Sequence, residues 1–186
     1  MVAADQGGRD QGRVEAGAGD VGGDRSSGVK PAARKHVHVR NQMQSDDTPL
    51  FVDLLKPDRL LVPGGVGTQP PAPGSHFVDH YTCYKTKVSA GTTRFARTSV
   101  TMTDALGQGS QGLLAYKPSR LCVQADTGQG LLNPGVHLMC YAVKPTVTPV
   151  LPQGVAVADE FGATQLNAIK DEELCVPSLV GEDGGG

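Results

Sequence analysis

Short segments in which apolar and polar residues alternate recur along the chain, separated by clusters of Gly, Pro, Ser and Asp. This period of two is the pattern of half-buried strands, and no stretch of about ten residues carries the 3.6-residue period of an amphipathic helix. Residues 164–173 offer the single plausible helical turn. The pattern predicts short strands at residues 50–55, 59–62, 77–87, 94–104, 113–116, 121–123, 136–144, 155–159, 166–169 and 174–176.

The predicted fold class is therefore all-β, a sandwich or barrel of short strands joined by regular turns. Residues 1–45 are rich in Gly, Asp and Arg without any apolar period, and we expect them to form a disordered tail. Residues 63–75 are so rich in Pro and Gly that we expect a linker without a strand or helix. Residues 181–186 are expected to form a flexible tail at the other end.

One arrangement of residues occurs twice in the chain. Each copy runs from an H-x-x-C-Y segment through a V-x-x-x-D segment to an L-C-V segment, over residues 80–123 and again over residues 137–176. A third, partial copy, K-P-D-R-L-L-V-P, starts at Lys56 and matches only the second half of the unit, with Leu61 in place of the cysteine. Such internal repeats set the architecture of a chain.

The repeat also predicts the domain boundaries. Residues 46–75 hold the partial copy and the linker, and residues 76–180 form one duplicated β domain, with copy one at 76–132 and copy two at 133–180. We expect two units related by a pseudo-twofold axis that share one core. Two independent beads are the alternative, but about 50 residues is few for a separate core.

Bulk composition gives no support to several classes of partner. The net charge of -2 gives no electrostatic reason to expect nucleic acid or an anionic membrane as a partner. No apolar run approaches the roughly 20 residues that span a bilayer. The chain has no Trp, four Phe and four Tyr, which argues against a platform that stacks on sugars or bases.

All four cysteines lie inside the two full copies, at matching positions. Paired cysteines in a loop-rich module indicate disulfides and an oxidising compartment. If the cysteines pair within a copy, the presence of Leu61 in place of a cysteine leaves no thiol unpaired. If the residue at position 61 instead normally paired with the cysteine of the next copy, Cys83 would now be unpaired. We therefore favour Cys83–Cys122 and Cys140–Cys175, each worth roughly 4 kcal/mol on the chain-entropy estimate. Pairing across the copies is the alternative.

The expected compartment is secreted or extracellular, although an exported chain should begin with a charged and then apolar leader and residues 1–45 contain none. The hypothesis that reconciles these observations is that the native leader and the missing half-repeat lie upstream and that this tail is an atypical or misassigned start.

A zinc site is the first chemical alternative. His80, Cys83, His137 and Cys140 form two H-x-x-C pairs, the residue types of a Cys2His2 site. On a strand, however, residues i and i+3 point to opposite faces, which disfavours chelation of one ion by each pair. The histidines His36 and His38 lie in the expected tail, where a solvated role is favoured over metal binding.

A dimeric aspartic protease is the second alternative. Asp126-Thr127-Gly128 matches the triplet of those enzymes, which need two aspartates that share a proton. The second copy lacks the triplet, so a homodimer would have to supply the partner. A turn after a strand explains the triplet equally well.

The combined motifs resemble an uncharacterised family of tandem repeats in secreted bacterial proteins. Its pattern is similar to H-x-x-C-Y-x-x-K, then V-x-V-x-D-x-F-G, then K-P-x-x-L-C-V-P, and the resemblance covers residues 46–180. Leu61 for Cys, Leu106 for Phe and Asp171 for Pro depart from it. The resemblance implies an extracellular module and carries over no catalytic residue, because the family has no assigned function.

The sequence thus predicts a non-enzymatic structural or binding module of an exported bacterial protein. We assign no catalytic residue, cofactor or metal. The expected partners are other extracellular proteins or cell-surface components.

Overall fold

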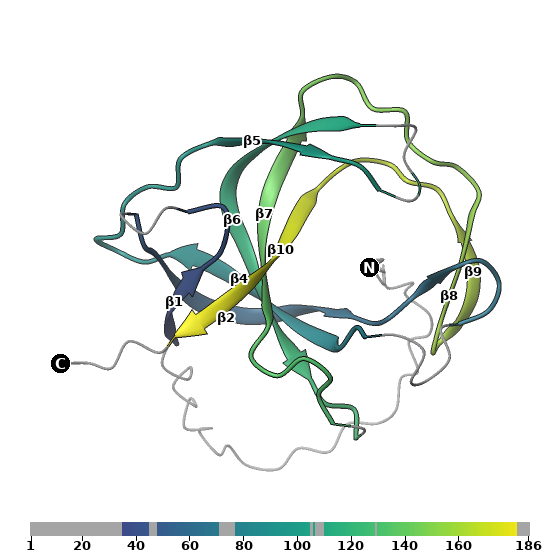
Figure 1. Cartoon of the computed structure of the whole chain (residues 1–186), viewed down its shortest axis with the longest axis horizontal. Helices are drawn as coiled ribbons and strands as arrows, with labels where there is room; N and C mark the ends of the chain where they lie inside the picture. The colour runs from purple at the N-terminus through teal and green to yellow at the C-terminus, as the bar shows by residue number, and fades with distance from the viewer. Residues whose placement is uncertain are drawn as a thin grey trace, which may run out of the picture.

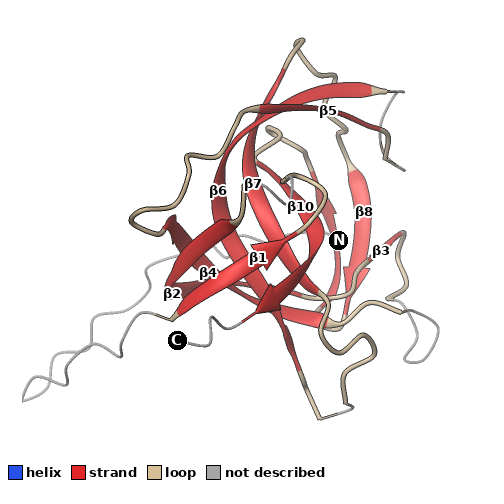
Figure 2. Ribbon diagram, turned by 60° about the vertical axis from the view of Figure 1, so that its left-hand side comes forward, coloured by secondary structure: helices blue, strands red, loops and turns tan. Residues whose placement is uncertain are grey.

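The computed structural model describes residues 35–44, 48–70, 77–104, 106, 110–128 and 130–181 (Figures 1 and 2). These residues form strands and loops only, which confirms the all-β prediction. None of them belongs to a helix that is long and apolar enough to cross a membrane. The strands are β1 His36–Arg40, β2 Leu50–Leu61, β3 Gly65–Val66, β4 His80–Val88, β5 Thr98–Met102, β6 Gln111–Ala125, β7 His137–Pro145, β8 Val155–Asp159, β9 Gly162–Leu166 and β10 Glu173–Gly181.

Seven strands form one antiparallel sheet in the order β4-β2-β1-β10-β7-β6-β5. Because β4 also pairs with β6, six of the strands close into a ring, and β5 joins the N-terminal end of β6. The remaining strands form a small sheet in the order β3-β8-β9, seen at the right of Figure 1. Pairing of β4 with β6, and of β1 with both β2 and β10, satisfies part of the backbone groups that an open sheet would leave at its edges.

Strand β7 is buried on both faces, since every residue from 138 to 143 is buried. Met139 and Tyr141 belong to one apolar cluster, whereas Leu138 and Cys140 belong to another. Successive strand residues point to opposite faces, so the two clusters cover opposite faces of the sheet. The larger cluster contains Val37, Val39, Leu50, Val52, Leu113, Ala115, Leu121, Met139, Tyr141, Val143 and Val176.

The smaller cluster is built around two disulfides, Cys83–Cys122 and Cys140–Cys175, which confirms the favoured pairing. Each disulfide joins residues that lie directly opposite each other on neighbouring strands. Sγ of Cys122 lies 3.8 Å from Sγ of Cys140, so the two bridges pack together. Leu61, which replaces the cysteine of the partial copy, is buried against them.

Strand β1 corrects the predicted tail. Residues 1–34 and 45 lie outside the described residues, but residues 36–40 pair with both β2 and β10. Val37 and Val39 are 1% and 0% exposed, so the expectation of disorder up to residue 45 is wrong here. Two valines in alternation are a very short apolar signal, and the polar composition of the preceding residues obscured it.

Other boundaries also differ from the expectation. The expected linker contributes Gly65–Val66 as β3, because their backbone pairs with β8, whereas residues 71–76 of the linker lie outside the described residues. The expected helical turn at 164–173 is wrong, since its first residues belong to β9. Strands β2 and β6 each continue through the Lys-Pro pair that was expected to interrupt them, by shifting register on both sides of the proline.

The ladder β2–β4 and the ladder β6–β7 follow the same register. Arg59 lies opposite Cys83, and its counterpart Arg120 lies opposite Cys140. The disulfide ladders β4–β6 and β7–β10 match each other in the same way. The segments that correspond in sequence therefore have corresponding neighbours in the sheet.

Strand β1 shares this correspondence. The pairing of Val37 with Val52 matches that of Val100 with Leu113 in β5 and β6. Oδ1 of Asn41 accepts a hydrogen bond from the backbone N–H of the residue two positions later, with an N–O distance of 2.9 Å. Oδ1 of Asp104 and Oδ1 of Asp159 accept the equivalent hydrogen bonds, at 2.9 and 2.8 Å. The segment V-H-V-R-N at residues 37–41 therefore has the same pairing and turn contact as V-T-M-T-D at residues 100–104. Its turn contact also matches that of V-A-V-A-D at residues 155–159.

Candidate functional site

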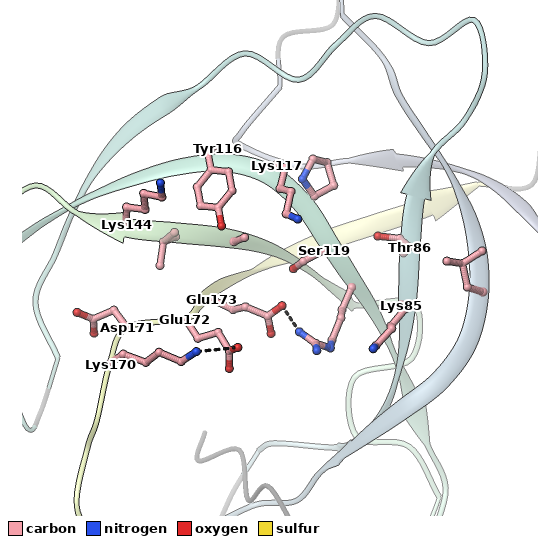
Figure 3. A pocket seen from close by; sticks show the side chains of 15 residues that line it. Lys85, Thr86, Tyr116, Lys117, Ser119, Lys144, Lys170, Asp171, Glu172 and Glu173 are labelled. Carbon is pink, nitrogen blue, oxygen red and sulfur yellow. Dashed lines mark hydrogen bonds and ion pairs between the residues drawn. The ribbon is translucent and has the colours of Figure 1, made fainter.

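A groove of about 470 Å³ lies beside the irregular middle of β6 (Figure 3). Pro118 has no N–H for the ladder, and the register shifts that flank it bend the strand and re-aim its side chains. The walls come from residues 116–120 of β6, residues 142–144 of β7 and residues 170–173, which lead into β10. Leu55 of β2 and Lys85 and Thr86 of β4 complete the lining.

One side of the groove is basic and aromatic. Nζ of Lys144 lies 5.5 Å from the ring centroid of Tyr116, and Nζ of Lys117 lies 6.0 Å from it. A lysine over an aromatic face at an exposed site gains about 0.5–1 kcal/mol. Among the described residues, neither lysine forms an ion pair with a carboxylate. The two ammonium groups are therefore available to an acidic group in the groove.

The other side of the groove holds a network of ion pairs. The Arg120 guanidinium contacts Asp58, with Nε to Oδ2 at 3.0 Å, and it also contacts Glu173. Burial alone would lower the pKa of Arg120, but Glu173 and Asp58 raise it above its ordinary value. The Arg120 side chain is only 14% exposed, so the charges hold strands β2, β6 and β10 together.

Arg59 extends this network from β2 to β10. It donates to Glu173 and to Glu172, both at 3.2 Å. The hydrogen bond from Arg59 lowers the pKa of the Glu172 carboxyl. Glu172 also pairs with Lys170 at 3.4 Å, as the dashed line in Figure 3 shows. The Glu172 and Glu173 carboxylates of the groove are therefore compensated by basic side chains, in contrast to the lysines beside Tyr116.

The sequence did not single out this groove. Lys117, Lys144 and Lys170 belong to segments that recur in the sequence, but the sequence pattern alone gives them no functional role. The missed signal is that all three lie beside the irregular Lys-Pro part of β6 and line one groove.

The four residues of the zinc alternative have other partners. Cys83 and Cys140 are both in disulfides, and a disulfide sulfur is not a thiolate ligand. Nε2 of His80 pairs with Oε1 of Glu160 at 3.1 Å. Burial lowers the pKa of His137, whose Nδ1 is buried without a hydrogen-bond partner among the described residues. No cluster of three or more His, Cys, Asp or Glu suited to a metal ion occurs in the described ranges.

Asp126 lies in an exposed turn after β6. Its Oδ1 accepts the N–H groups of Gly128 and Gly130 at 2.8 and 2.9 Å. Gly128 has a φ of 98°, which a glycine adopts without strain. The Asp-Thr-Gly triplet thus has the geometry of an aspartate-stabilised turn.

The structure also brings Ser89, His36 and Asp53 together, a cluster that the sequence did not predict. The Ser89 hydroxyl donates to Oδ1 of Asp53 at 2.6 Å and lies 2.8 Å from Nδ1 of His36. The same Nδ1 lies 3.1 Å from the Asp53 carboxylate. A Ser-His-Asp relay needs the two partners on different ring nitrogens. Here both contact Nδ1, so the cluster joins β1, β2 and the end of β4 as a structural contact.

Comparisons with protein-family models, with curated proteins and with solved structures found no match to this chain.

Proposed function

We propose that this chain is a non-enzymatic module of an exported protein that binds other extracellular proteins or cell-surface components. The observation that carries the proposal is the pair of disulfides at the centre of a buried cluster. Such bridges form and persist in oxidising compartments and are rare where thiols are kept reduced. Cys83, Cys122 and Cys140 are 1%, 0% and 1% exposed, which makes the bridges part of the folded core.

The groove is the surface that we assign to binding. Lys117 and Lys144 flank Tyr116 and present two ammonium groups to a ligand. The chain as a whole carries a net charge of -2, so attraction of an acidic ligand has to come from this local patch. A carboxylate or sulfate on a neighbouring macromolecule would fit this chemistry.

The state of the groove's polar groups favours binding over catalysis. The carboxylates of Glu172 and Glu173 are paired with arginines, and the Ser119 hydroxyl donates to the carbonyl oxygen of Cys140 at 2.9 Å. A nucleophile needs an adjacent base that is free to take its proton. The corresponding registers of the ladders further support a repeated module, as in the secreted bacterial family that the sequence resembles.

Cell fractionation tests the export claim. Immunoblots of the native host should find the chain outside the cytoplasm, and a purely cytoplasmic chain would contradict the proposal.

Chromatography on immobilised heparin, as a model polyanion, tests the groove. The Lys117→Ala/Lys144→Ala double variant should elute at lower salt than the wild type. The Lys56→Ala/Lys87→Ala double variant is the matched control, because it removes the same charge from exposed positions outside the groove. Equal elution of the two double variants would refute binding by the groove.

A further inference from the structure

The ring of strands has two edges without a backbone partner in the described part of the chain. Strand β2 pairs with β4 on one side, and β1 covers the other side only at residues 50–53. Strand β10 pairs with β7 through residues 173–178, and β1 reaches its other side only at residues 179–181. Figure 1 shows β2 and β10 diverging from β1. We call the two free edges, residues 55–61 and 173–178, the seam.

Side chains rather than a backbone ladder join the two edges of the seam. Arg59 of β2 reaches Glu172 and Glu173 beside β10, at 3.2 Å in each case. Leu61 lies two residues from Arg59 on the same strand and packs against the disulfides. The two edges of the seam are therefore joined by ion pairs, and the apolar cluster around the disulfides lies beside them.

The matching registers show which strand type would complete the seam. Strand β6, the counterpart of β2, has β7 along one side, and its other side is shared by β5 and β4. On β2, the place of β7 is taken by β4 and the place of β5 is taken by β1. On β6, β4 pairs with the residues around Cys122. On β2, the corresponding residues around Leu61 have no strand on that side in the described part of the chain. Since β4 contains an H-x-x-C-Y segment, the unfilled position on β2 is that of a strand of the H-x-x-C-Y type.

We propose that the seam is a docking site for one additional H-x-x-C-Y-x-x-K strand, supplied by a second molecule that carries this repeat. The incoming strand would pair with the backbone of both edges, and its side chains would alternate between the two faces. By the register of Cys83 with Cys122, its cysteine would lie opposite Leu61. Because Leu61 has no thiol, docking would be reversible.

Disulfide trapping tests the proposed register. The probe is a synthetic peptide of residues 77–88 whose cysteine carries a thionitrobenzoate leaving group. The thiolate introduced by Leu61→Cys attacks the peptide sulfur, forms the new S–S bond and releases thionitrobenzoate as a coloured thiolate. The control is Leu60→Cys, at a position that is 47% exposed, whereas Leu61 is 6% exposed. Docking predicts at least a tenfold faster reaction at position 61 despite its burial, with mass spectrometry locating the link.

A second measurement decides the question if Leu61→Cys does not fold. Fluorescence anisotropy follows a labelled peptide with serine at the cysteine position as it binds the unaltered chain. We expect saturable binding, at least fivefold tighter than that of a scrambled peptide. The Lys117→Ala/Lys144→Ala variant should bind the peptide as the wild type does, because neither lysine belongs to the seam. Failure of the groove proposal can thus be told apart from failure of the seam proposal. Faster trapping at position 60, or equal binding of both peptides, overturns the proposal.

Discussion

The disulfides should contribute a large part of the stability of this small fold, and removal of one bridge measures that share. The perturbation is the double replacement Cys83→Ala/Cys122→Ala, compared with Cys140→Ala/Cys175→Ala. The two bridges span 39 and 35 residues of sequence, so they close loops of nearly equal length. The double variants therefore form a matched pair.

The structure sets the expected magnitude. The chain-entropy estimate gives about 4 kcal/mol for each loop, and the difference in loop length changes it by only about 0.1 kcal/mol. Loss of buried sulfur packing adds on the order of 1 kcal/mol per fully buried cysteine. Cys175 is only partly buried, so the Cys140–Cys175 pair should lose slightly less. Domains of this size have total stabilities of about 5–15 kcal/mol, so either loss is severe.

Guanidinium chloride titration, followed by circular dichroism, measures the free energy of unfolding of each variant by linear extrapolation. The wild type in the presence of a reductant serves as a second reference. Because Sγ of Cys122 lies 3.8 Å from Sγ of Cys140, removal of both bridges should depart from additivity. A loss below about 1 kcal/mol for each pair would refute the conclusion that the bridges staple the fold.

Three further predictions concern single elements of the fold. Val37→Ala and Val39→Ala should each destabilise the protein by roughly 2 kcal/mol in the same titration, since both valines are buried; no loss would mean that β1 is not part of the core. Burial lowers the pKa of His137 below its ordinary 6.5, so the unfolded chain binds the proton more readily and stability should fall as pH drops through about 6.5. His137→Phe should flatten this part of the stability–pH profile, whereas the His80→Gln control should keep the fall; an unchanged slope in His137→Phe would contradict the assignment. Tyr141→Phe should cost about 1–2 kcal/mol by thermal unfolding, because its hydroxyl bonds Asn41 and Gln44; an unchanged melting temperature would contradict this.

Local patterns were sufficient for much of the sheet. The alternation in H-x-x-C-Y segments predicted β4 and β7 to within a few residues, and residues 155–159 form β8 as expected. The absence of a cysteine at Leu61 was sufficient to favour pairing within each copy, because that pairing leaves no orphan thiol. These features depend on contacts that are encoded in short stretches of sequence.

The missed features depend on distant contacts. Strand β1 is held by pairing with β10, about 140 residues away, and no local composition announces it. The V-H-V-R-N segment at residues 37–41 was nevertheless a readable counterpart of V-A-V-A-D. The groove depends on the bend at Pro118, which brings Tyr116, Lys144 and Lys170 together from three strands or their approaches. Such convergence follows from the register of the sheet rather than from any single segment.

The thiol state of the protein in the cells that make it tests the central claim most directly. Free thiols are alkylated before lysis, and the purified chain is then mapped by mass spectrometry without reduction. The account predicts two linked peptide pairs, Cys83 with Cys122 and Cys140 with Cys175, and no alkylated cysteine. Four alkylated cysteines, or bridges between the two copies, would contradict an exported module stapled within each copy.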